Sequence, residues 1–219
     1  MTQKIILDLC GGTGSWSRPY KENGYDVRVI TLPEYDLIGR TEITEGGRLV
    51  FTKRDGSEEV IDAREVYGIL AAPTCTMFSL ARTTAKTPRD LGGAMELVEK
   101  CLRIIWTCRA QEGSRLKFWA LENPFGLLRQ FLGRPFYTFS PEQFGEVYTK
   151  KTDLWGYFNI PSGTPHKQTD DEKLRSIRNN RVLPELPEGY EMPEGWSRQA
   201  ARRSMTSSKF AAAFYRANK

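Results

Sequence analysis

Residues 5–16 read Ile-Ile-Leu-Asp-Leu-Cys-Gly-Gly-Thr-Gly-Ser-Trp, an apolar run followed by a glycine-rich turn. This order predicts a buried strand, a tight turn and a helix, and the Asn-Gly pair at 23–24 would end that helix. Glycines let a ligand approach the backbone closely, and the helix amides behind the turn favour polar or anionic groups. The spacing does not match the NAD fingerprint. Three interpretations stay open: a dinucleotide site, a nucleoside site or simply a tight turn.

Strands and helices alternate along the rest of the chain. We expect strands at residues 25–32, 66–72, 116–121 and 152–159, a hairpin formed by 49–52 and 58–61, and helices at 91–108 and 200–218. This alternation predicts an α/β fold with a mostly parallel sheet and helices on both faces. Residues 160–196 are rich in proline, glycine and charge, so they form a small segment apart from the rest.

The composition excludes several classes of protein. A chain of 219 residues suits one domain with at most a small appendage. No apolar run approaches the roughly 20 residues that span a bilayer, and the immediate entry into a strand leaves no room for a signal peptide. We therefore expect a cytoplasmic protein that does not contact membranes.

The cysteines and the histidine limit the possible chemistry further. Four cysteines without paired spacing do not make a disulfide framework. A single histidine, His166, excludes zinc sites built from several imidazoles and argues against a histidine-based triad. We expect no metal site.

The charge distribution is basic, with 32 Lys and Arg against 27 Asp and Glu, a net charge of +5 and a pI of about 9.0. This excess suits either a solvated surface or a face that binds a polyanion. Residues 161–219 hold 11 Lys and Arg against 7 Asp and Glu. Within them, Arg175, Arg178 and Arg181 recur every three residues and would form one stripe on a helix. The stripe either contacts nucleic acid or is a solvated face.

Two predicted strands end at residues that can carry chemistry. Cys75 follows strand 66–72 in a loop that begins at Pro73, where open α/β sheets place reacting groups. A cysteine nucleophile must become a thiolate, and the alternative is a small buried hydrophobe. Glu122 follows strand 116–121, and its carboxyl could hydrogen-bond a substrate ring or belong only to a turn. Lys150, with its neighbour Lys151, precedes the last predicted strand and either meets phosphate or is solvated.

These segments, taken in order, resemble the cytosine-C5 DNA methyltransferases. Residues 8–14 resemble the turn that binds S-adenosylmethionine in that family. Residues 73–79, Pro-Thr-Cys-Thr-Met-Phe-Ser, resemble its nucleophile loop Pro-Pro-Cys-x-x-Phe-Ser, with a threonine at position 74. Residues 122–124 resemble its Glu-Asn-Val segment in the Glu-Asn-Pro form of small phage-type members. The resemblance covers residues 4–159 and 197–218.

Other positions depart from the family pattern. Phe-Gly at 144–145 sets the register in which the family's Gln-x-Arg-x-Arg falls on Tyr148, Lys150 and Thr152. Lys150 therefore replaces the first arginine, and the second is absent. Residues 203–211 resemble the segment that completes the cofactor pocket, although serines replace its usual prolines.

The resemblance implies a fold, a cofactor and a partner. Residues 1–159 and 197–219 would form a catalytic domain with a Rossmann-like, S-adenosylmethionine-dependent methyltransferase fold, and 160–196 a small target-recognition segment. The cofactor would be S-adenosylmethionine and the partner double-stranded DNA. The protein would be a monomer in the cytoplasm of a bacterium or a phage-infected cell.

The resemblance also assigns roles to residues. Cys75 would bond to C6 of a flipped cytosine, Glu122 would hold the ring at its N3 edge, and Lys150 would steady the backbone or the loop of Cys75. The residues expected to hold the cofactor are Asp8, Gly11, Gly12, Gly14, Trp16, Glu34 at the ribose and Asp62 near the adenine. Arg175, Arg178 and Arg181 would contact the nucleic acid.

Two alternatives remain. The same chemistry could act on tRNA or another RNA. The chain could instead be a nucleic-acid-binding homologue with impaired catalysis, which the departures at Thr74, Tyr148 and Thr152 would fit.

Overall fold

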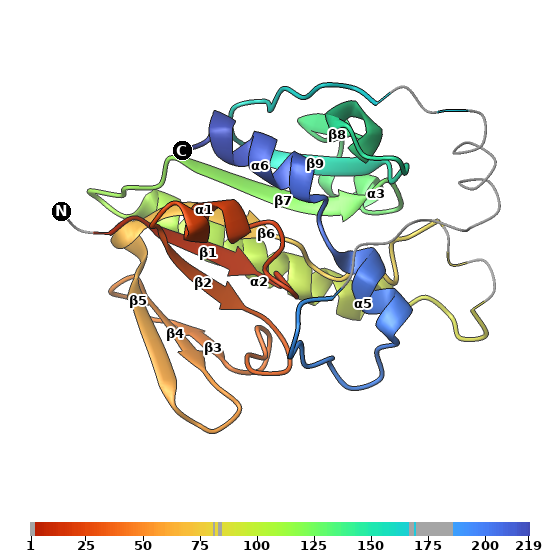
Figure 1. The fold of residues 1–219 in the computed structure, drawn as a ribbon. Helices are drawn as coiled ribbons and strands as arrows, with labels where there is room; N and C mark the ends of the chain where they lie inside the picture. The colour runs from red at the N-terminus through yellow and green to blue at the C-terminus, as the bar shows by residue number, and fades with distance from the viewer. Residues whose placement is uncertain (1–2, 81, 83–84, 167–168, 170–185) are drawn as a thin grey trace.

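A six-stranded sheet of order β2-β1-β6-β7-β9-β8 runs through the protein in the computed structural model, which describes residues 3–80, 82, 85–166, 169 and 186–219 (Figure 1). Its strands are β1 (Ile5–Leu9), β2 (Asp26–Ile30), β6 (Val66–Ala71), β7 (Phe118–Pro124), β8 (Tyr137–Phe139) and β9 (Thr152–Tyr157). Strands β2, β1, β6 and β7 are parallel, whereas β9 pairs antiparallel with both β7 and β8. The predicted α/β fold with a mostly parallel sheet is confirmed.

The order of the strands reverses at β1. Strands β2 and β6, which follow β1 in this sheet along the chain, lie on opposite sides of it. In open α/β sheets, ligands bind outside the carboxyl ends of the strands at such a switch point. Leu9 pairs with Ala71, and Ala71 pairs with Leu121, so β1, β6 and β7 reach this edge together.

Two different layers cover the faces of the sheet (Figure 1). One face packs against α2 (Leu91–Ala110) and a three-stranded antiparallel sheet of β3 (Thr41–Ile43), β4 (Arg48–Thr52) and β5 (Glu58–Asp62). The other packs against α1 (Arg18–Glu22) and α6 (Ser208–Ala217), with a core rich in aromatic rings. Because side chains alternate along a strand, Asp8 shares the α1 face with Ile6, and Leu7 and Leu9 face α2.

The C-terminal helical region differs from the sequence prediction. A single helix was expected over 200–218, but the structure has α5 (Arg198–Ser204) and α6, separated by an extended turn. Ser207 causes the break because its hydroxyl accepts a hydrogen bond from the amide of Phe210 and caps the start of α6. The remaining short elements are α3 (Arg129–Leu132) and two 3-10 turns, Ala63–Glu65 and Pro141–Phe144.

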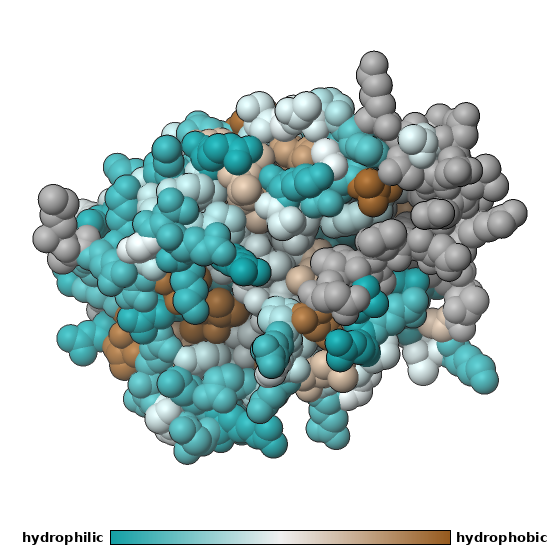
Figure 2. Space-filling view, in the orientation of Figure 1, coloured by the Kyte–Doolittle hydropathy of each residue, from teal (hydrophilic) through white to brown (hydrophobic). Residues whose placement is uncertain are grey.

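The surface is largely hydrophilic on the face shown in Figure 2, where hydrophobic residues gather only in small patches. In the described ranges, none of the helices has the length and apolarity to cross a membrane. Within the segment 160–196, the residues that the structure describes form neither helix nor strand.

Candidate functional site

A cavity of about 680 Å³ opens at the edge where β1, β6 and β7 end. Its walls include six of the residues predicted from the sequence: Asp8, Gly11, Trp16, Cys75, Glu122 and Lys150. They come from the glycine turn, the loop after β6, the end of β7 and the segment before β9. The structure therefore brings together residues that lie more than a hundred positions apart in the chain.

The glycine turn leaves room beside β1 for a buried carboxyl group. A Cβ atom at Gly11 would lie 2.3 Å from the carboxyl carbon of Asp8, so only glycine fits there. Gly12 and Gly14 have φ angles of +56° and +67°, a conformation that glycine adopts without strain. Cys10 adopts φ +57° as well, which is uncommon for a residue with a side chain. The turn is thus shaped closely around Asp8.

Asp8 and Trp16 each present a buried polar atom without a partner. Asp8 is fully buried, and its Oδ2 accepts a hydrogen bond from the Ser17 hydroxyl at 2.5 Å, whereas its Oδ1 has no partner. The indole N–H of Trp16, a residue only 2% exposed, also lacks a partner. Buried polar atoms of native proteins are rarely left unbonded. Because Asp8 and Trp16 both line the cavity, these two atoms are the candidates for bonding a ligand there.

The buried position of Asp8 changes its acidity. Burial raises the pKa of this carboxyl to about 7, and the hydrogen bonds from Ser17 oppose the shift only partly. The group therefore gains or loses its proton near neutral pH. A cationic or hydrogen-bond-donating ligand would favour its ionised form.

Cys75 lies in a compact turn beyond β6. The amides of Phe78 and Ser79 both donate to the carbonyl of Cys75, at 3.0 and 2.8 Å. Burial raises the pKa of the Cys75 thiol, the nearby cation of Lys150 lowers it, and the carboxyl of Glu122 raises it. The thiol is consequently protonated at neutral pH until a reaction partner or a positive charge favours the thiolate.

Glu122 and Lys150 form the polar pair beside this thiol. The Nζ of Lys150 lies 3.7 Å from Oε1 of Glu122, which is 8% exposed. Burial raises the pKa of the Glu122 carboxyl, and Lys150 lowers it. Thr152, at the register of the second arginine, donates its hydroxyl to the Lys150 carbonyl at 2.7 Å and so fixes the backbone that carries the lysine.

The structure adds site residues that the sequence did not indicate. Asn123 is fully buried, and its Nδ2 donates to the carbonyl of Pro73 at 3.0 Å, which ties β7 to the start of the loop that carries Cys75. Trp196, Gln199 and Arg203 line the cavity from the opposite side, on and just before α5. The adjacency of Asn123 to Glu122 was a usable signal, and Arg203 begins the segment 203–211 that resembles the one completing the cofactor pocket. Nothing in the sequence pattern marked Trp196 or Gln199.

Two predicted cofactor residues are not brought to the cavity. Glu34 follows β2 at the same edge of the sheet but is exposed and does not line the cavity. Asp62 ends β5 just before β6 begins at Val66, so it lies at the opposite edge. Its carboxylate accepts from the amide and guanidinium of Arg64, which hold its pKa at about 2. The structure gives Asp62 a capping role.

The structure places the two other predicted glycines of the turn outside the first cavity. Gly12 belongs to the turn without lining the cavity, and its amide donates to the Thr31 hydroxyl at 3.1 Å. Gly14 lines a neighbouring cavity instead. Arg175, Arg178 and Arg181 lie outside the described residues.

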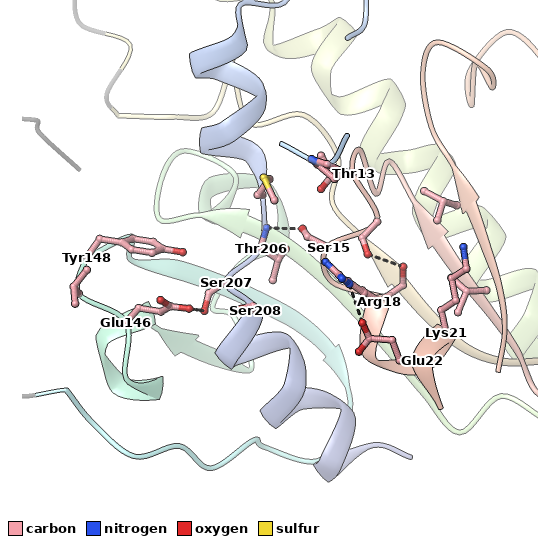
Figure 3. Close-up of a pocket in the computed structure, with 17 residues that line it drawn as sticks. Thr13, Ser15, Arg18, Lys21, Glu22, Glu146, Tyr148, Thr206, Ser207 and Ser208 are labelled. Carbon is pink, nitrogen blue, oxygen red and sulfur yellow. Dashed lines mark hydrogen bonds and ion pairs between the residues drawn. The ribbon is translucent and has the colours of Figure 1, made fainter. Parts of the chain in front are cut away.

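The neighbouring cavity, of about 700 Å³, lies beside α1 and the turn between α5 and α6 (Figure 3). Its polar side chains largely bond to one another. The Thr206 amide donates to the Ser15 hydroxyl at 2.9 Å, Ser207 donates to Glu146 at 2.7 Å, and Arg18 pairs with Glu22 at 2.9 Å. This arrangement links the glycine turn to the C-terminal segment. Among the described residues, the lining of this cavity includes Lys21, Glu22 and Glu146 but, unlike that of the first cavity, no cysteine.

Comparison with known proteins does not assign a family: no family model matches the chain, and no curated protein matches it significantly. Among the described residues, no group of three or more His, Cys, Asp or Glu side chains is placed to hold a metal ion. The chemistry of the first cavity is therefore the basis for a functional conclusion.

Proposed function

We propose that the protein is a DNA (cytosine-C5) methyltransferase that uses S-adenosylmethionine, and that its sheet is that of a Rossmann-like methyltransferase. The observation that carries the proposal is one cavity, at the switch point of the sheet, lined by Cys75, Glu122, Lys150 and a glycine turn. The order of the four motifs in the sequence supports the same function.

The glycine-turn half of the cavity fits the cofactor. Oδ1 of Asp8 can accept a hydrogen bond from an ammonium or hydroxyl group, and Nε1 of Trp16 can donate one. Gly11 keeps the wall open beside Asp8. When bound, S-adenosylmethionine supplies an electrophilic methyl group.

The other half fits a cytosine ring. Carbon 5 of cytosine is a weak nucleophile, and addition of the Cys75 thiolate at C6 would make it enamine-like, so that C5 could bond to the methyl group of the donor. Loss of the C5 proton to solvent would then break the bond between C6 and sulfur, restore the ring and release the Cys75 thiolate. Burial raises the pKa of the Glu122 carboxyl, and this group would hold the ring by a hydrogen bond at its N3 edge. Lys150 stabilises the thiolate by its charge. Because stacking hides both faces of the base in a duplex, the cytosine must flip out to reach Cys75.

The test is methyl transfer from S-adenosylmethionine labelled in its methyl group. Duplex DNA of mixed sequence, unmethylated tRNA and a blank without nucleic acid are compared, and the products are digested and separated by chromatography. We expect label in 5-methylcytosine from the duplex only. Label in tRNA alone would transfer the proposal to RNA, and calorimetric cofactor binding without any transfer would indicate the impaired homologue.

A further inference from the structure

The loop that carries Cys75 is held from two sides. Asn123 bonds the carbonyl of Pro73 at its start. At its end, the guanidinium of Arg89 donates to two carbonyls, that of Met77 at 2.5 Å and that of Ser79 at 2.9 Å. Arg89 belongs to none of the motifs found in the sequence, and the proposed mechanism does not use it.

Arg89 is itself attached to a rigid element. It immediately precedes Asp90, whose side chain caps α2 by accepting from the amide of Gly93 at 2.9 Å. Helix α2 is 20 residues long, and its buried face belongs to the core that covers the sheet. The bonds from Arg89 therefore connect the nucleophile loop to the main body of the protein.

The two carbonyls belong to the same turn as the nucleophile. The amides of Phe78 and Ser79 donate to the Cys75 carbonyl, so residues 75–79 form one hydrogen-bonded turn. The side chain of Phe78 is fully buried, and the backbone carbonyl of Phe78 accepts a hydrogen bond from the amide of Leu127 at 2.9 Å. Releasing the carbonyls of Met77 and Ser79 would free the cavity side of this turn while Phe78 stayed anchored.

We propose that Arg89 is a positioning residue that fixes the Cys75 thiol beside Glu122 and Lys150 by bridging the two carbonyls. A guanidinium suits this task because its donors form a planar, rigid fork, whereas a lysine ammonium is a single flexible point. Arg89 is not among the described residues that line the cavity, and the pKa of the Cys75 thiol responds to Lys150 and Glu122. It therefore acts through loop geometry.

The proposal predicts opposite changes in two reactions. In Arg89→Ala, the loosened loop exposes the thiol to water, so the pKa of Cys75 falls and iodoacetamide alkylates it several-fold faster at pH 7.5. Methyl transfer falls instead, by on the order of 10- to 100-fold in kcat, because the thiol loses its alignment. For Arg89→Lys, the alkylation rate and kcat should lie between those of Arg89→Ala and the wild type. Cofactor affinity should stay unchanged in both variants.

The alkylation experiment follows the cysteines separately by peptide mass spectrometry across pH 6–10. Cys101 and Cys108 are buried and report on the fold as a whole. The matched control is Arg103→Ala, which removes an exposed arginine from α2 that pairs only loosely with Glu99, at 3.8 Å. We expect faster alkylation at Cys75 alone in Arg89→Ala and a wild-type profile in the control.

Two results would overturn the proposal. One is an Arg89→Ala protein with wild-type alkylation of Cys75 and wild-type kcat. The other is acceleration at Cys101 and Cys108 equal to that at Cys75, which would make Arg89 a residue of general stability. The kcat measurement rests on the proposed function, but the alkylation measurement does not. If the wild type transfers no methyl group, the proposed function fails while the position of Arg89 is still tested.

Discussion

The two halves of the main cavity are built in opposite ways. In the glycine-turn half, buried Asp8 and Trp16 each keep a polar atom without a partner. In the nucleophile half, the backbone around Cys75 is braced by bonds from Asn123 and Arg89. We propose that a ligand completes the first half. The backbone of the second half is held by bonds within the protein, although Oδ1 of Asn123 also lacks a partner. Binding and reaction should therefore be separable by mutation.

The largest effect is expected when Cys75, the proposed nucleophile, is removed. Cys75→Ala should reduce methyl transfer on the order of 10⁴-fold or more, as loss of a covalent nucleophile does in other enzymes. Cofactor affinity, measured by calorimetry, should stay within about twofold because the glycine turn is unaffected. Cys108→Ala, which removes a buried thiol from α2, is the control. An equal loss of methyl transfer in Cys75→Ala and Cys108→Ala would contradict the separate roles of the two halves of the cavity.

The next effect concerns Asp8, where stability and binding should change in opposite directions. The folded-state pKa of about 7 lies above the ordinary 3.8, so folding favours the protonated carboxyl. The resulting penalty is absent below about pH 4, grows as the pH rises to 7 and is complete above it. Asp8→Asn should therefore raise the stability of the ligand-free protein at pH 8 by up to about 4 kcal/mol, and it should weaken cofactor binding at least tenfold.

Denaturant unfolding at pH 5 and pH 8 checks this prediction. Asp62→Asn is a control of opposite sign: the pKa of Asp62, about 2, lies below its ordinary value, so its charge stabilises the fold above pH 4 and this contribution is lost as the pH falls through 2. Loss of stability in both variants at pH 8 would contradict the account of Asp8. Unchanged cofactor affinity in Asp8→Asn would remove Asp8 from the binding half.

A smaller effect is expected from crowding the turn. Gly11→Ala would place a methyl group against the Asp8 carboxyl and should cost about 1–3 kcal/mol of stability, together with cofactor affinity. Gly56→Ala has open space around it but a φ of +85°, so it should cost about 1 kcal/mol through backbone strain alone. Thermal unfolding with and without cofactor separates the two variants. Full cofactor stabilisation in Gly11→Ala would show that the turn does not face the ligand.

The smallest effect belongs to Lys150. Lys150→Met removes the cation that lowers the pKa of Cys75, so alkylation of the thiol should move to higher pH and methyl transfer should fall several-fold. Lys150→Arg should retain most of the activity because a cation stays beside Glu122. A Lys150→Met protein with the wild-type alkylation profile would mean that the lysine does not act on the nucleophile half.

The sequence was sufficient to predict those features of the site that follow from the order of the strands. The apolar runs at β1, β6 and β7 and the polar residues after them were sufficient to place Asp8, Cys75 and Glu122 at one edge, because parallel strands end together. The sequence could not show at which edge a hairpin strand ends. Asp62 was therefore expected at the cofactor, although β6 begins only a few residues later and holds it at the far edge.

Contacts to the backbone were also beyond prediction. Arg89 and Asn123 bond carbonyl groups, which every residue carries, so no pattern of side chains marks their partners. The break between α5 and α6 depends on the Ser207 cap inside a stretch that otherwise suits a helix. Strands β3 and β8 are too short to show a periodic pattern.

The most direct test of the central claim is to trap the covalent bond. The wild-type protein is incubated with S-adenosylmethionine and a duplex that contains 5-fluorocytosine, whose fluorine prevents the final elimination, and the cross-linked peptide is sequenced by mass spectrometry. The account predicts a cofactor-dependent adduct on Cys75. An adduct on Cys10 or another cysteine, or no adduct from a protein that binds both cofactor and duplex, would contradict it.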